Sequence, residues 1–264
     1  DAAAKARRTG ESILARTRTM LQQHGWPDYT SATVDLLGAE TLYGPHARAG
    51  SAREVMVRVV VSHPLKQALE MFAKEISPAG TSWSPGTTGP GGGRPTPSPH
   101  IKPFSFLVDK SSVAVTVRMG DRVWPVAVPV DAAVGSASSL PSPAPWVETG
   151  EALVEVPLIR LAWARSGDKG DISNIGLVAR RPEWLPLLWA RVTPEVVKAY
   201  FSHLVQGQVE RFHLPGIDAM NLVMHEALGG GGPASTRNDP LGKGMGQILL
   251  DMPVQVPASV ASTS

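Results

Sequence analysis

The sequence predicts an α/β unit followed by an α+β unit of ferredoxin-like type. Hydrophobic periodicity alternates between helical and strand-like over residues 4–76, and a second series of short strands and helices follows residue 150. Residues 131–149, rich in Ala, Ser and Pro, separate the two series as a linker would. The expected divisions are a first domain over 1–130, a linker over 131–150, a second domain over 151–258 and a tail over 259–264.

The first unit is predicted to layer helices on strands. Residues 4–23 carry apolar side chains at spacings of three and four, which indicates a helix. Residues 30–37 and 55–61 are strand-like, the second being rich in β-branched residues. Residues 65–76 return to the helical spacing. A helix, strand, strand, helix order favours an α/β layer.

Residues 77–100 interrupt this pattern. Half of these positions are Gly or Pro, so we expect neither a helix nor a central strand there. The segment could be a flexible linker, or an ordered loop that lets backbone approach a ligand closely. Strand-like runs over 101–108 and 113–117 follow at once, which favours a long loop inside a domain.

The second unit is predicted to contain about two main helices and four or five strands. Strands are expected over 154–163, 175–178, 208–213, 221–225 and 252–256. Helices are expected over 182–191 and 194–204, each opened by a proline suited to a first turn, and a short one over 241–249. This composition indicates an α+β sandwich of ferredoxin-like type.

Composition excludes several classes of function. The formal net charge is +2, so electrostatics predict no nucleic-acid or membrane partner. The chain has no cysteine, which excludes disulfides and thiolate chemistry and fits a cytoplasmic location. No apolar run approaches the ~20 residues of a membrane helix. The seven histidines show no metal-binding spacing, so we expect no metal and identify no cofactor.

Polar side chains crowd the segment between two predicted strands, residues 165–174. The candidate catalytic residues are Asp168, Lys169, Asp171 and Asn174, and Arg165 is a candidate ligand-binding residue. An Asp would act as the acid or base, and Lys169 would stabilise a developing oxyanion. The alternative is a solvated turn with local Asp caps and surface ion pairs that contribute little.

Two glycine-rich segments, residues 80–94 and 229–243, could supply backbone N–H groups to an anion. Neither a P-loop nor the nucleophile elbow of hydrolases is present in the first segment. The candidate ligand-binding residues are Thr81, Ser82, Thr87, Thr88, Gly91, Gly92, Arg94, Gly230, Gly231, Arg237 and Lys243. The alternative for both segments is a mobile surface loop. A shared site requires all three polar segments to enclose one pocket between the domains.

Two blocks of sequence resemble one family. The stretch Pro78-Ala79-Gly80-Thr81-Ser82-Trp83-Ser84-Pro85-Gly86-Thr87-Thr88-Gly89 is similar to the late region of the large domain of acyclic terpene utilisation (AtuA-like) proteins. Ala164-Arg165-Ser166-Gly167-Asp168-Lys169-Gly170-Asp171, with the later Ala227-Leu228-Gly229-Gly230-Gly231-Gly232, resembles the ferredoxin-fold domain attached to it. The resemblance therefore implies an α/β partial domain followed by an α+β ferredoxin-like domain.

The resemblance also implies a function. The family is named for the catabolism of acyclic terpenes such as citronellol, a route through branched acyl-CoA esters. We expect an enzyme performing hydratase or lyase chemistry on an acyl-CoA or carboxylate, with a CoA ester as possible substrate. The alternative is a non-catalytic assembly subunit for neighbouring acyl-CoA enzymes. Family members carry a further α/β segment upstream, which implies a fragment or association with an upstream segment of the same gene product. The alternative partner that we expect is a second copy of the chain, in a homo-oligomer.

Overall fold

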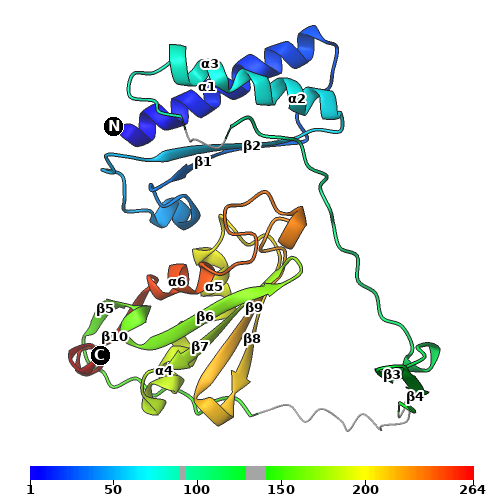
Figure 1. The fold of residues 1–264 in the computed structure, drawn as a ribbon. Coiled ribbons are helices and arrows are strands. Elements are labelled where there is room, and N and C mark those ends of the chain that lie inside the picture. The colour runs from blue at the N-terminus through cyan, green and yellow to red at the C-terminus, as the bar shows by residue number, and fades with distance from the viewer. Residues whose placement is uncertain (90–92, 129–140) are drawn as a thin grey trace.

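The computed structural model describes residues 1–89, 93–128 and 141–264, and its first unit is a helical layer on a two-stranded sheet (Figure 1). Helices α1 (Ala2–Gln23), α2 (Lys66–Glu75) and α3 (Ser77–Ser82) form the layer. Strands β1 (Ser31–Leu37) and β2 (Met56–Ser62) pair antiparallel, with Ser31 opposite Ser62. The apolar stripe of α1 supplies Ile13, Leu14 and Leu21 to the core.

The second unit is built on a four-stranded antiparallel sheet in the order β6-β7-β9-β8. Its strands are β6 (Ala162–Lys169), β7 (Ile172–Ala179), β8 (Val209–Leu214) and β9 (Ala219–Met224). The helices are α4 (Leu185–Arg191), α5 (Pro194–Tyr200), α6 (Met245–Leu250) and α7 (Ala258–Thr263). A separate ribbon pairs β5 (Leu153–Pro157) with β10 (Pro253–Pro257).

The sheet of the second unit has one buried and one open face. Strand β7 alternates strictly, with Ser173, Ile175 and Leu177 buried among the side chains of the helices. The opposite face leaves Trp163 51% exposed and Phe212 49% exposed. The core of this unit therefore lies on the helix side of the sheet, and its other side is not covered by any described element (Figure 1).

The two units contact each other through the 3₁₀ helix Thr41–His46 and the α5 region. His46 Nε2 lies 2.9 Å from the carbonyl oxygen of Tyr200, and the two rings stack with centroids 4.0 Å apart. His203 Nε2 lies 3.0 Å from the carbonyl oxygen of Leu42. These contacts place the outer face of the β1–β2 sheet opposite the loops of the second unit (Figure 1).

A hairpin stands apart from both units (Figure 1). It consists of β3 (Thr116–Met119) and β4 (Arg122–Pro125), paired antiparallel as a sheet of their own. Every residue from 98 to 128 is exposed. The hairpin thus makes no core with the rest of the described chain.

Outside residues 165–174, four predictions of secondary structure are wrong. Residues 77–82 form helix α3, because Pro78 stands in the first turn, where a missing N–H costs nothing. Residues 101–108 form no strand, because no described strand pairs with them. Residues 154–163 are two strands of different sheets, divided by the turn Leu158–Arg160. Helix 194–204 ends at Tyr200.

The segment that was expected to be a tail, residues 259–264, is largely helical. The N–H and hydroxyl groups of Ser259 both donate to the Glu151 carboxylate at 2.9 Å. These bonds lower the pKa of Glu151, because a carboxylate that accepts hydrogen bonds holds its charge more easily. The end of the chain is thereby fixed next to β5.

Candidate functional site

The predicted polar loop 165–174 consists mostly of strand residues. Residues 165–169 belong to β6 and 172–174 to β7, leaving Gly170 and Asp171 as the turn. Gly170 has φ +67°, a conformation that glycine adopts without strain. The prediction of a ten-residue loop is therefore wrong, because the strands extend through the polar residues to the tip.

Strand alternation divides the candidate catalytic residues between two faces. Asp168 is paired with Ser173, whose side chain is buried on the helix side. Lys169 and Asn174 lie on the opposite, open face, as does the exposed Arg165. There Asn174 Nδ2 donates to Asn221 Oδ1 at 3.1 Å. Asp168 thus does not share a face with Lys169 or Asn174.

Asp171 joins the hairpin tip to the second glycine-rich segment. Its Oδ1 accepts the N–H groups of Leu228 at 3.0 Å and Gly230 at 2.9 Å. Its backbone carbonyl accepts the N–H of Ala227 at 2.9 Å. A Cβ added at Gly231 would collide with the Gly170 carbonyl, so the two loops are in backbone contact. The expected convergence of these two segments is therefore observed.

Arg237 also stabilises the glycine-rich loop, through hydrogen bonds to backbone carbonyl groups. Its guanidinium donates to the carbonyl oxygens of Ala227 and, at 2.9 Å, of Leu204. Burial lowers the pKa of Arg237, and the nearby Asp171 carboxylate opposes that shift. The N–H groups of Gly231 and Gly232 also donate within the loop, to the carbonyl oxygens of Leu228 and Pro240. Most of the glycine-loop donors proposed for an anion are thus used internally.

Asp168 and Lys243 form a more accessible pair. Lys243 Nζ lies 3.5 Å from Asp168 Oδ1, and the Lys243 and Asp168 side chains are 63% and 30% exposed. The backbone beneath them is fixed: Asp239 Oδ1 accepts the Lys243 N–H at 2.9 Å, and the Ser166 hydroxyl donates to the Lys243 carbonyl at 3.1 Å. The geometry gives a carboxylate and an ammonium that face solvent on a rigid support.

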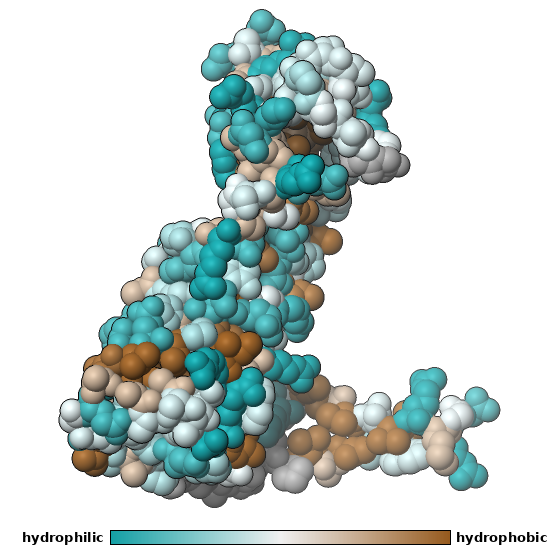
Figure 2. Space-filling view, turned by 90° about the vertical axis from the view of Figure 1, so that its left-hand side faces the viewer, coloured by the Kyte–Doolittle hydropathy of each residue, from teal (hydrophilic) through white to brown (hydrophobic). Residues whose placement is uncertain are grey.

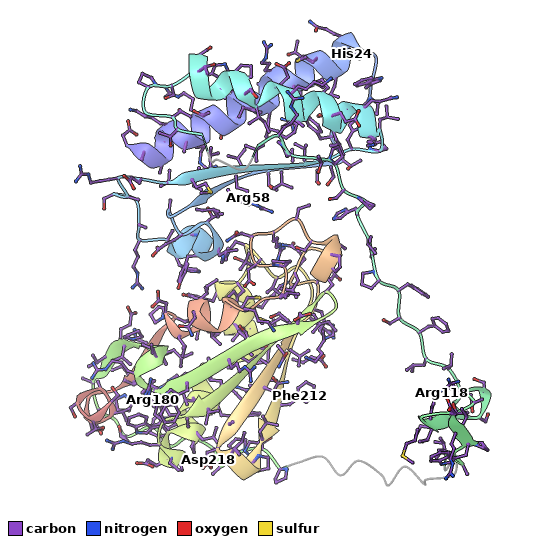
Figure 3. All side chains as sticks on the ribbon, in the orientation of Figure 1. His24, Arg58, Arg118, Arg180, Phe212 and Asp218 are labelled. Carbon is purple, nitrogen blue, oxygen red and sulfur yellow. The ribbon has the colours of Figure 1, made fainter. Side chains whose placement is uncertain are left out.

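An arginine from the first unit reaches the same loop. Arg58 Nη1 donates to Asp35 Oδ2 at 2.7 Å and to the Thr236 carbonyl at 3.0 Å. Figure 3 shows Arg58 between the β1–β2 sheet and the loops of the second unit. Sequence reasoning missed both Arg58 and Asp35. An arginine inside the apolar run of residues 55–61 was the available signal, because a charge in a half-buried strand needs a partner.

The structure places the first glycine-rich segment elsewhere. Thr81 and Ser82 end α3, in the helical layer that the β1–β2 sheet separates from the second unit (Figure 1). Trp83 and Ser84 line an open groove of about 530 Å³ with Lys5 and Arg8. The other candidates there are Thr87, Thr88 and Arg94, which are half-buried or exposed, and Gly91 and Gly92, which lie outside the described residues. The described residues of this segment do not meet the other two segments, so an enclosure by all three is not observed.

A small crevice lies between the described residues of the two units. Its volume is about 10 Å³, and it is lined by Leu42, Leu204, Arg237 and Asp239 among others. This volume is smaller than a substrate and about the size that one water centre requires. Neither Asp168 nor Lys243 lines this crevice, and the Lys243 ammonium of the pair is exposed at the surface.

Metal-binding clusters and membrane-spanning helices are both absent from the described residues. Residues 1–89, 93–128 and 141–264 contain no group of three or more His, Asp or Glu side chains arranged to hold a metal ion. None of the helices in these ranges combines the length and the hydrophobicity of a transmembrane span.

The structure defines a chain of two units, an α/β layer followed by an α+β unit whose hairpin tip is locked to a glycine-rich loop. Residues 1–119 match the model of the acyclic terpene utilisation family protein AtuA, and residues 156–255 match the AtuA ferredoxin-like domain. The chain belongs to the AtuA-like family, and the predicted fold class is confirmed. No curated protein and no solved structure matches the chain.

Proposed function

We propose that this chain is an enzyme of acyclic terpene utilisation that performs acid–base chemistry, of hydratase or lyase type, on a branched acyl-CoA or carboxylate. Membership of the AtuA-like family supports a role in acyclic terpene utilisation. The observation that supports the chemistry is the Asp168–Lys243 pair, with its 3.5 Å separation and its exposed side chains. A reaction on a soluble thioester and the lack of cysteine fit the cytoplasm, which we propose as the location.

The side-chain contacts of the candidate residues limit which of them can act in catalysis. The Asp171 carboxylate holds the glycine loop, and Lys169 and Asn174 lie on the other face of the sheet. Asp168 is then the acid or base, since its carboxylate accepts no backbone N–H among the described contacts. Lys243 supplies the positive charge for a carboxylate or a developing enolate oxygen. Arg165 remains a candidate only for a ligand on the open sheet face.

A second candidate function is a non-catalytic assembly subunit for neighbouring acyl-CoA enzymes. Two observations favour it: the crevice at the junction holds about 10 Å³, and residues 98–128 expose many large apolar side chains. A binding module needs an exposed surface and no enclosed cavity. The two functions differ in whether the isolated chain turns over a thioester.

The test uses the full chain and CoA thioesters of methyl-branched acids, both saturated and α,β-unsaturated. Asp168→Asn is expected to lower turnover by at least about 100-fold with binding retained, as removal of a general acid or base does. Lys243→Met is expected to weaken binding about tenfold by calorimetry. The matched control is Lys66→Met with Glu70→Gln, which removes an exposed ion pair of similar length, 3.4 Å, from α2.

Unchanged turnover and affinity in both variants would remove the pair from the site. Absence of binding and turnover in the native chain, together with co-purification of an acyl-CoA enzyme, would favour the assembly subunit. Thermal melts of each variant establish that it is folded before its kinetics are compared.

A further inference from the structure

The exposed hairpin has the sequence pattern of a buried structure. Between residues 113 and 128 the register places alternate residues on one face. The residues of that face, the apolar face of the hairpin, are Val113, Val115, Val117, Met119, Trp124, Val126 and Val128, with Arg122 at the turn. The other face carries Thr116 and Arg118 with their cross-strand partners Pro125 and Val123, so it is more polar but not free of apolar side chains. Such alternation is typical of a strand pair with one face against a core.

No core covers this face in the described chain. Met119 is 67% exposed and Trp124 41% exposed, and in the segment leading to the hairpin Phe104 is 86% exposed. Figure 2 shows a projection rich in hydrophobic residues that stands away from the body, and Figure 1 identifies it as the hairpin segment. A two-stranded hairpin is at best marginally stable in water, so this one requires a surface to pack on.

The total surface supports the same conclusion. The chain has an accessible surface of 16212 Å². A folded monomer of 28.0 kDa is expected to expose about 11,000 Å². Part of the excess of about 5,000 Å² comes from residues 98–128, which are all exposed, and covering the apolar face of the hairpin would bury surface of the kind that obligate interfaces bury. A second copy of the chain can cover the exposed hairpin, because each copy carries both a hairpin and an open sheet face on which the hairpin of the other copy can pack.

The open face of the four-stranded sheet is the matching receptor. Cross-strand register aligns Trp163, Val178, Ala219 and Leu214 in one apolar row. Phe212 stands in the next row with Arg165 and Asn221, so the apolar row is bordered on one side by polar side chains. Figure 3 shows Phe212 on β8 and Arg118 on the distant hairpin. Sheets pack face to face at about 10 Å through interdigitating apolar side chains, which both faces supply.

We propose that the apolar face of the hairpin of one copy packs on the open sheet face of a second copy, and that the exchange is reciprocal and forms a dimer. The isologous arrangement follows because the same two surfaces meet twice about a two-fold axis. The proposal does not depend on the chemistry assigned to Asp168 and Lys243, whose pair lies on the helix side of β6.

The chain has no cysteine, so single cysteines can be placed cleanly. Val117→Cys on the apolar face, combined with Phe212→Cys on the sheet, is expected to give a covalent dimer with a short bismaleimide at micromolar concentration. The matched control is Arg118→Cys with Phe212→Cys, because Arg118 is the neighbouring residue on the opposite hairpin face. We expect this control to cross-link far less than the Val117 pair.

Sedimentation of the native chain is expected to show a dimer that Val117→Glu converts to monomer and Arg118→Glu does not. Cross-linking only within one chain would overturn the proposal, since the hairpin would then fold back on its own sheet. Equal cross-linking by the control pair, or a monomer at all concentrations, would overturn it as well. None of these outcomes bears on whether the Asp168–Lys243 pair turns over a thioester.

Discussion

The two glycine-rich segments have similar compositions and opposite environments. In the segment over 229–243, all four glycines from Gly229 to Gly232 have positive φ, and Asp171 and Arg237 bind the loop from two sides. In the segment over 80–94, a Cβ added at Gly80, Gly86 or Gly93 would meet nothing within 4 Å. Glycine content therefore predicts that the backbone can adopt unusual conformations, but it does not predict whether the loop is packed or open. One segment is internally bonded within the second unit, and the described residues of the other form open surface.

The largest expected effect comes from Gly231→Ala. The new Cβ would strike the Gly170 carbonyl while the residue holds φ +69°. Both costs act on backbone that cannot shift easily, so we expect a loss of about 3–4 kcal/mol in the free energy of unfolding. Urea denaturation followed by tryptophan fluorescence measures it. A loss below about 1 kcal/mol would show that the two loops are not in tight contact.

Asp171→Ala is expected to cost about 2–3 kcal/mol, because it leaves two N–H donors without their acceptor and the half-buried Arg237 guanidinium without a neighbouring charge. Denaturant midpoints measure the change. Asp109→Ala is the matched control, since Asp109 accepts the N–H and hydroxyl of Ser111 in an exposed turn. If both variants lose the same stability, Asp171 is only a local turn residue.

Gly86→Ala tests the open segment. Gly86 has φ +84° and free space around it, so only the conformational strain of a non-glycine residue opposes the change. We expect a loss of about 1 kcal/mol or less, well below that of Gly231→Ala. A loss as large as that of Gly231→Ala would mean that the first segment is also packed.

The smallest effect concerns pH at the contact between the units. Burial lowers the pKa of His203 from its ordinary value of 6.5, and its Nδ1 has no hydrogen-bond partner among the described residues. The unfolded chain binds a proton that the folded chain resists, so stability falls as the pH drops below 6.5 and levels off below the folded pKa. Above that ordinary pKa the residue has no such effect.

His203→Gln keeps a donor for the Leu42 carbonyl and removes the titration. The difference in melting temperature between about pH 7.5 and about pH 5.5 is therefore expected to be smaller in this variant than in the native chain. Identical differences in the two proteins would exclude His203 as the cause.

Local patterns predicted much of the secondary structure. The apolar spacing of Ile13, Leu14 and Leu21 indicated helix α1, and the β-branched run of residues 55–61 indicated β2. The predictions were wrong where the pairing between strands, and not the local sequence, determines where a strand begins and ends. Residues 154–163 look like one apolar strand, but β5 pairs with β10, about 100 residues away, whereas β6 pairs with the neighbouring β7.

The candidate site was predictable to a limited extent. The density of charge at 165–174 and the four glycines at 229–232 indicated two segments that do meet. Their chemistry was not predictable, because the use of Asp171 depends on N–H groups 57 and 59 residues away. Strand alternation, which separates Asp168 from Lys169, could have been applied only if the strands had been extended to the hairpin tip.

Hydrogen exchange of the backbone amides tests the contrast between the two segments most directly. The N–H groups of Leu228 and Gly230 are expected to exchange slowly in the native chain and to lose that protection in Asp171→Ala, while that of Gly86, which lies outside any helix or strand, exchanges rapidly in both. Rapid exchange at Leu228 and Gly230 in the native chain would contradict the assignment of Asp171 as the residue that holds the glycine loop.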